Sequence, residues 1–180
     1  LVLLLIWHLM QTGLGFGQAV RQASFNGVSI MTGTGYVSAN FSAWGGFATT
    51  ILLIVMFIGG CGGSTTCGIK VFRLQVLAST AKVQISRLLR PHAVVLAYYN
   101  KRPVSVEVMD SVMGFFYLFI LGFVLIAIML GIAGLDFVTA LSGAATSISN
   151  VGPGLGEVIG ADGNFSTLPD SAKWIMTFAM

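Results

Sequence analysis

The sequence predicts an all-α membrane protein of two tandem units, each with a helix, a short re-entrant helix, a polar loop and a second helix. Three observations predict this class. Of the 180 residues, 56% are hydrophobic and only 8% are charged, against about 25% charged residues in soluble domains. No Asp, Glu, Lys or Arg occurs over residues 22–69. Two polar, glycine-bearing segments, residues 32–36 and 149–154, interrupt otherwise apolar sequence.

The first unit is predicted over residues 1–70. A membrane-spanning helix needs about 20 apolar residues, so the uncharged run is too long for one helix. We expect a first helix over residues 1–13 that continues upstream, an amphipathic half-helix over 18–31, a loop at 32–36 and a full helix over 41–58. The glycine-rich residues after position 58 should then break that helix, because Gly costs about 1 kcal/mol relative to Ala in a helix interior.

A basic connector is predicted over residues 71–102. The segment from 70 to 102 contains no Asp or Glu and holds most of the basic residues, namely Lys70, Arg73, Lys82, Arg87, Arg90, Lys101 and Arg102. Because basic loops stay in the cytoplasm, we place it there, and the mouth of the loops with residues 155–168 outside. Apolar residues among the basic ones over 71–89 predict an interfacial helix. Nucleic acid or anionic lipid would be the alternative partner of this basic run, but topology explains it and we expect no nucleic acid.

The second unit, residues 103–180, repeats the plan of the first. An uncharged helix is expected over 111–135, a half-helix over 136–148 with Asp136 as its N-cap, and the start of another spanning helix over 172–180. The units also agree locally, because Asn-Phe-Ser occurs at 40–42 and again at 164–166. Such duplication usually arranges repeated membrane units around a shared axis.

The polar loops are the candidate site. Gly35 and Gly152 each lie six residues after a hydroxyl residue, Ser29 and Thr146. Irregular backbone in lipid is tolerated only where it is buried or lines a wet cavity, and backbone carbonyls can replace the hydration shell of a monovalent cation. The half-helices aim their negative C-terminal ends at the loops. We therefore predict a cation-binding selectivity filter formed by Thr32, Gly33, Thr34, Gly35, Ser149, Asn150, Val151 and Gly152. Ordinary turns between packed helices are the alternative.

The glycine-rich segment is a candidate gate on the cytoplasmic side of the filter. Its residues are Gly59, Gly60, Gly62, Gly63, Ser64, Thr65, Thr66, Gly68 and Lys70. Close helix packing on small residues is the alternative. Lys70 is most simply an interfacial anchor, and Cys61 and Cys67 are interpreted as small packing residues, without the spacing of a metal site. No catalytic arrangement of Ser, His, Cys or carboxylates is apparent, so we expect no enzyme activity.

Three segments, residues 32–36, 149–156 and 62–70, resemble the membrane subunit of the Trk/Ktr/HKT potassium transporter superfamily, most closely its bacterial TrkH type. The resemblance extends over the whole chain and corresponds to the third and fourth of four helix, pore-helix, helix repeats. It implies that Gly35 and Gly152 are filter glycines, that residues 59–68 are the intramembrane gating loop, and that a pore-facing Arg lies beyond residue 180.

The resemblance also implies a pseudo-fourfold pore in one polypeptide of the bacterial inner membrane. K⁺ would be the bound and transported ion, with no covalent cofactor. A homodimer and a cytoplasmic nucleotide-binding regulatory subunit of the TrkA kind are the implied partners beside the lipid bilayer. We therefore predict gated, passive potassium uptake.

Three alternative functions remain open from the sequence. The first is an ion-coupled secondary transporter with a midplane site, which usually needs a charged intramembrane residue. The uncharged runs contain none. The second is transport of Na⁺ and K⁺ with weak selectivity. The third is a structural or interaction module that conducts no ions.

Overall fold

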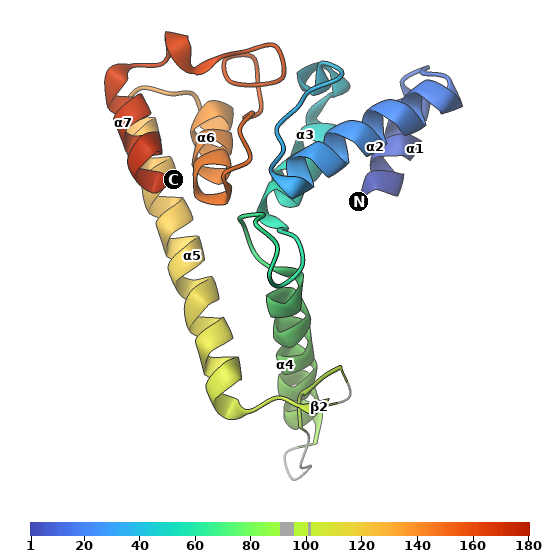
Figure 1. The fold of residues 1–180 in the computed structure, drawn as a ribbon, viewed down its shortest axis with the longest axis vertical. Coiled ribbons are helices and arrows are strands. Elements are labelled where there is room, and N and C mark those ends of the chain that lie inside the picture. The colour runs from blue at the N-terminus through green and yellow to red at the C-terminus, as the bar shows by residue number, and fades with distance from the viewer. Residues whose placement is uncertain (91–95, 101) are drawn as a thin grey trace.

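The structure is a computed structural model, and it describes residues 1–90, 96–100 and 102–180 (Figure 1). Lys101 of the predicted basic connector therefore lies outside the described residues. The elements, in chain order, are α1 (Val2–Gln11), α2 (Phe16–Thr32), η1 (Phe41–Trp44), α3 (Gly46–Phe57), α4 (Val71–Leu89), β1 (Tyr98–Tyr99), β2 (Arg102–Pro103), α5 (Val106–Ile132), α6 (Phe137–Ser149), η2 (Phe165–Thr167) and α7 (Asp170–Ala179). The two strands pair antiparallel, Tyr98 with Pro103, and the described elements are otherwise helical.

The two predicted units form two groups of helices at one end of the molecule (Figure 1). α1, α2 and α3 make up one group, while α6, α7 and the C-terminal half of α5 make up the other. The larger hydrophobic core joins the groups, because Leu52 and Val55 of α3 belong to the same buried cluster as Ala145 and Val151 of the second unit. This shared core fixes the position of one unit relative to the other.

α5 is the helix most suited to cross a membrane. Among the described residues it alone has the required length and apolarity, with 27 residues and a mean hydropathy of 2.8 over its most apolar window. At 1.5 Å per residue such a helix is about 40 Å long, more than the roughly 30 Å hydrocarbon core. Only 6% of that window is buried, so most of its side chains face outward, as lipid contact requires.

α4 has the predicted bounds, residues 71–89, and its position at a membrane interface stays a prediction. It lies lengthwise beside the N-terminal half of α5 (Figure 1), and side chains of both helices, among them Leu77 and Met109, line one cavity of about 550 Å³. α4 thus continues away from the glycine-rich loop, with its first turn packed against the middle of α5.

The predicted single helix over residues 41–58 is wrong, because the structure divides it. Residues Phe41–Trp44 form a 3-10 helix, Gly45 turns the chain with φ 89°, and α3 begins only at Gly46. The cause lies in Asn40, whose side chain accepts a hydrogen bond from the Ser42 amide (3.0 Å) and starts the short helix. Asn164 does the same for the Ser166 amide (3.0 Å), so the repeated Asn-Phe-Ser motif marks equivalent 3-10 turns.

Candidate ion-coordinating site and gate

The first polar loop leaves α2 through two glycines in the left-handed region, Gly33 (φ 68°) and Gly35 (φ 76°). The amides of Thr34 and Gly35 both donate to the Ser29 carbonyl, at 3.0 and 3.4 Å. The Ser29 hydroxyl donates to the Tyr36 carbonyl (2.7 Å) across the loop. Positive φ favours glycine, so these positions are specified by backbone shape and not by side-chain chemistry.

The second polar loop leaves α6 in the same way. Asn150 takes the left-handed conformation (φ 49°), and Gly152 has φ 104°. The Val151 amide donates to the Thr146 carbonyl (3.1 Å), and the Gly152 amide donates to the Thr146 hydroxyl (3.0 Å). Thr146 thus binds two successive amides of the loop, and the hydroxyl spacing seen in the sequence corresponds to a structural equivalence.

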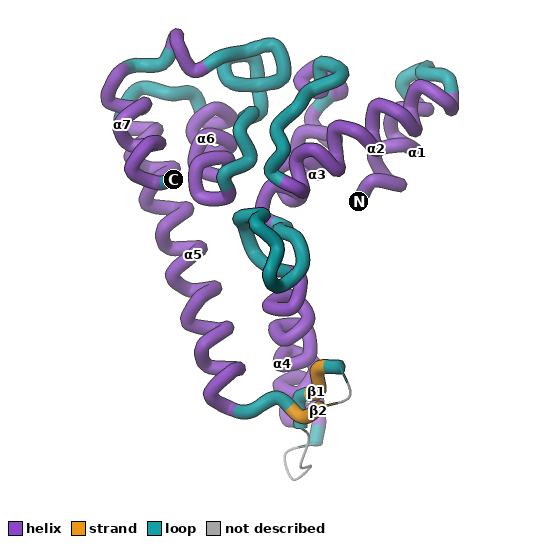
Figure 2. The backbone as a smooth tube through the Cα atoms, viewed as in Figure 1, coloured by secondary structure: helices purple, strands orange, loops and turns teal. Residues whose placement is uncertain are grey.

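The two loops meet. A Cβ at Gly35 would lie 2.8 Å from the Val151 carbonyl oxygen and 3.8 Å from the Cα of Gly152, while a Cβ at Gly33 would lie 3.2 Å from the Asn150 carbonyl oxygen. Figure 2 shows the corresponding loops side by side between the two helix groups. The C-terminal ends of α2 and α6 therefore converge on one place, where their aligned peptide dipoles favour a cation.

Where the two polar loops meet, the backbone carbonyl oxygens differ in hydrogen bonding from those one helical turn earlier. Within the described part of the chain, the carbonyls of residues 32–35 and 149–152 accept no hydrogen bond, whereas the carbonyls one turn earlier, at Ser29 and Thr146, are bonded. The Thr32 and Thr34 hydroxyls bond each other (2.7 Å), and the buried Ser149 hydroxyl has no hydrogen-bond partner among the described residues. The arrangement can offer unbonded backbone oxygens from two sides to an ion.

Asn26 supports the first loop and was missed by the sequence analysis. Its side chain, fully buried in α2, donates to the Ser38 hydroxyl (3.0 Å) and accepts from the Ser38 amide (3.1 Å). These bonds hold the chain where it returns from the loop. The available signal was an amide residue within a half-helix that the sequence predicts to lie in the membrane, where a buried polar group needs a partner.

The glycine-rich segment interrupts the helix as predicted, between Phe57 and Val71, and forms a loop with a narrow neck. The Gly59 amide donates to the Ile69 carbonyl (2.9 Å), and the Ile69 amide donates to the Phe57 carbonyl (2.8 Å). The Val71 amide also donates to the Gly60 carbonyl (3.2 Å). A Cβ at Gly59 would collide with the Cys67 carbonyl, so only glycine allows the two limbs of the neck to approach so closely.

The Lys70 side chain does not extend away from the loop, as the side chain of a snorkelling anchor would. Its ammonium group turns back into the loop and donates to the Ser64 carbonyl (2.6 Å) and to the Thr66 carbonyl. The Ser64 and Thr66 hydroxyls bond each other (2.6 Å), and the Thr66 hydroxyl accepts from the Gly60 amide (2.9 Å). Lys70 therefore cross-links two backbone carbonyls of the loop.

The interpretation of the cysteines as packing residues is also corrected. Cys61 and Cys67 are both exposed in this chain. The Cys67 sulfur lies 3.7 Å from the side-chain nitrogen of Asn150, which donates to it. This contact joins the glycine-rich loop to the second polar loop, so the two predicted functional segments touch.

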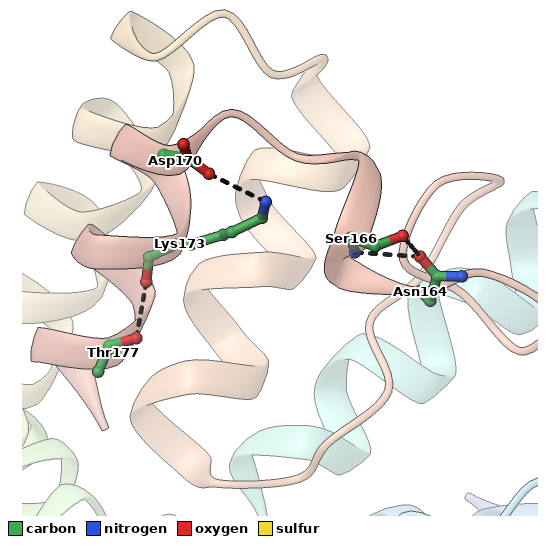
Figure 3. A network of polar contacts seen from close by, with 5 residues as sticks. All are labelled: Asn164, Ser166, Asp170, Lys173 and Thr177. Carbon is green, nitrogen blue, oxygen red and sulfur yellow. Dashed lines mark hydrogen bonds and ion pairs between the residues drawn. The ribbon is translucent and has the colours of Figure 1, made fainter.

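The segment before α7 is ordered by short polar contacts (Figure 3). Asn164 accepts from Ser166, and the Lys173 ammonium lies 3.1 Å from the Asp170 carboxylate on the first turn of α7. Lys173 also lines a cavity of about 250 Å³ with Thr146 and Gly152. The Lys173 ammonium group thus lies near the second polar loop, and the Asp170 carboxylate neutralises its charge.

Comparison with known proteins gives consistent matches along the chain. The family model described as TrkH, cation transport protein, matches residues 10–180. The chain belongs to the TrkH family. It is 44% identical over 177 residues to the Trk system potassium uptake protein TrkI of Halomonas elongata, covering 98% of this chain and 36% of that protein. It is 34% identical to TrkH of Escherichia coli K12, covering 87% of this chain and 32% of the relative.

The solved structures agree with the family assignment. The crystal structure of the potassium transporter TrkH from Vibrio parahaemolyticus matches with a TM-score of 0.91 and 35% identity, over 100% of this chain and 38% of that one. The predicted fold class, a helical membrane protein with pore-helix repeats, is confirmed. The chain spans about a third of the length of these TrkH-family relatives, which are named as potassium transporters and not as enzymes.

Proposed function

We propose that the protein to which this chain belongs carries K⁺ into the cell through a selectivity filter, of which residues 32–35 and 149–152 supply two of the loops. One observation supports this above all: two helix C-termini meet at a place where the carbonyls of both loops accept no hydrogen bond from the described residues. Such oxygens can replace the hydration shell of a monovalent cation. The names of the relatives, potassium uptake proteins, support K⁺ as the ion.

We propose that residues 59–70 form the gate. The loop contacts the second filter loop through Cys67 and Asn150, and Lys70 holds it in a compact shape through bonds to Ser64 and Thr66. An ion leaving the filter on that side would meet this loop. The closed shape is stabilised by a small set of hydrogen bonds, each worth about 0.5–1.5 kcal/mol, which a regulator could overcome.

The complete assembly follows from the same proposal. Further repeats of the same plan would complete a pseudo-fourfold pore in the bacterial inner membrane, with the connector over residues 71–102 in the cytoplasm. A homodimer and a regulatory subunit of the TrkA kind are the proposed partners. The basic, carboxylate-free connector supports this orientation, because positive charge is retained on the cytoplasmic side.

The filter is tested by ⁸⁶Rb⁺ flux into proteoliposomes that hold the full-length protein. Gly35→Val and Gly152→Val should abolish flux, since both positions need positive φ and lie where the loops meet. Gly13→Val and Gly134→Val are matched controls, because both also have φ +92° but face open space. Undiminished flux in the filter variants would refute the filter. Flux tied stoichiometrically to H⁺ or Na⁺ would favour a secondary transporter instead.

The gate is tested in the same vesicles by deleting part of the loop between Gly62 and Thr66. The shortened loop should raise ⁸⁶Rb⁺ flux, because it obstructs less of the path. Lys70→Gln should raise flux by a smaller factor, since it removes the ammonium bonds but leaves the neck intact. Unchanged or reduced flux in protein that still folds would instead assign the glycines to helix packing.

A further inference from the structure

Both ends of the glycine-rich loop rest on one aromatic stripe of α5. Phe115, Phe119 and Phe123 are spaced by four residues, so they lie along one face of the helix. The Phe57 ring, at the end of α3, packs edge-on against Phe119 and Phe123, with centroids 6.0 and 5.0 Å apart. The limb that enters the loop is therefore anchored to α5 by an apolar contact.

The limb that leaves the loop is anchored differently. The Arg73 guanidinium, in the first turn of α4, lies 3.9 Å from the centroid of the Phe115 ring and 5.3 Å from that of Phe72. The ion pair between Asp170 and Lys173 is the only one among the described residues, so Arg73 has no carboxylate partner there. The aromatic face is the group that compensates its charge, as a cation–π contact does.

The position of this contact along α5 makes it costly to break. Phe115 lies nine residues after Val106, about 14 Å along the helix axis, and five residues after Asp110, the last acidic residue of α5. The flanking α5 sequence is apolar from that point on. A guanidinium that left Phe115 at this depth would have few polar groups to turn to, because polar side chains in apolar surroundings require partners.

We propose that Arg73 is a positioning residue of the gate, latching the first turn of α4 to Phe115 so that the loop stays closed. This inference rests on the gate proposed above. The Arg73 amide donates to the Lys70 carbonyl (2.9 Å) and Val71 is bonded to Gly60 (3.2 Å), so the latch and the loop move as one piece. If α4 moves along α5, the contact between Arg73 and Phe115 must therefore break before the loop can change shape.

The test compares ⁸⁶Rb⁺ flux of full-length variants in proteoliposomes, with folding checked by gel filtration and thermal midpoint. Arg73→Gln and Phe115→Leu should each raise basal flux by roughly fivefold or more, because a cation–π contact in apolar surroundings is worth more than an exposed one. The double variant should show no more than either single variant. Phe115→Tyr keeps the aromatic face and should retain low flux. Arg87→Gln removes the same charge from the same helix, at a position where no ring of the described residues stacks on the guanidinium, and should also retain low flux.

Several outcomes would overturn the latch. Flux at the parent level in Arg73→Gln and Phe115→Leu, while the shortened loop still raises flux, rejects the latch and leaves the gate standing. Flux raised equally by Arg87→Gln would indicate a general charge effect. Additive increments in the double variant would show that Arg73 and Phe115 act separately. If shortening the loop also has no effect, the gate itself fails.

Discussion

The loop after α2 and the loop after α6 leave their helices through the same sequence of backbone states. Each begins with a left-handed residue, Gly33 or Asn150, and continues to a glycine of positive φ, Gly35 or Gly152. In each, the intervening amide returns to a carbonyl five residues back, at 3.0 Å in the first loop and 3.1 Å in the second. The backbone is thus the same in both, although only the glycine is identical in sequence.

The side-chain bonds of the two loops differ. In the first loop the Ser29 hydroxyl is a donor to the Tyr36 carbonyl, whereas in the second the Thr146 hydroxyl is an acceptor for the Gly152 amide. The capping residue of the first loop has no side chain, but Asn150 extends one to Cys67 of the glycine-rich loop. Under the proposed function, the shared backbone would serve ion coordination, which needs several equivalent loops. The Asn150 side chain of the second loop would connect coordination to the proposed gate.

The largest effect on flux is expected when the glycine of either loop, Gly35 or Gly152, is replaced. Gly35→Ala should lose at least as much ⁸⁶Rb⁺ flux as Gly152→Ala, because a methyl group at Gly35 would lie 2.8 Å from the Val151 carbonyl, whereas one at Gly152 meets only the Gly35 Cα at 3.7 Å. Both variants carry the strain of positive φ, of order 1–2 kcal/mol. A reversed order, measured in vesicles with equal protein, would contradict the packing of one loop on the other.

The second prediction compares the loss of the Thr146 hydroxyl with the loss of the Ser29 hydroxyl. Thr146→Val keeps the shape of the side chain but leaves the Gly152 amide without its acceptor, which should cost about 1–3 kcal/mol. Ser29→Ala removes a donor from the carbonyl of the exposed Tyr36, which water can bond instead, so it should cost less. Thermal midpoints and flux of both variants measure the difference. Thr146→Ser is the control that restores the acceptor, and it should behave as the parent does.

The third prediction concerns the Asn150 side chain of the second loop, because Gly33 occupies the equivalent position of the first loop. Asn150→Gly keeps the left-handed backbone and makes the second loop resemble the first, but it removes the bond to the Met180 carbonyl (3.3 Å) together with the bond to Cys67. Flux should rise by roughly twofold to fivefold, the factor of one weak hydrogen bond, and the preference for Rb⁺ over Na⁺ should be unchanged. A lost preference, seen as Na⁺ competing with ⁸⁶Rb⁺ uptake, would place Asn150 in coordination and not in coupling to the gate.

The features that were predictable from the sequence are those fixed by local chemistry. The bounds of α4 and α6, and Asp136 as the cap of α6, follow from hydropathy, periodicity and capping preferences within a few residues. The break at Gly45 was missed because the apolar pattern runs through it. The turn of Lys70 into its own loop and the contact of Cys67 with Asn150 were missed because they depend on loop closure and on packing between segments 83 residues apart.

The smallest effect concerns how the two half-helices begin. α6 starts at Asp136, whose carboxylate accepts from the Thr139 amide (3.2 Å), whereas α2 starts at Gly15 with no side-chain cap. Asp136→Ala should therefore cost about 1 kcal/mol of stability, with little change in flux.

Hydrogen bonding by Thr139 lowers the pKa of Asp136 below its ordinary 3.8. A lowered pKa means that the cap stabilises the protein fully above 3.8 and loses its effect as the pH falls through the folded value. The difference in thermal midpoint between parent and variant should accordingly be constant near neutral pH and shrink in acid, and a difference that persists unchanged in strong acid would show that the carboxylate is not the cap.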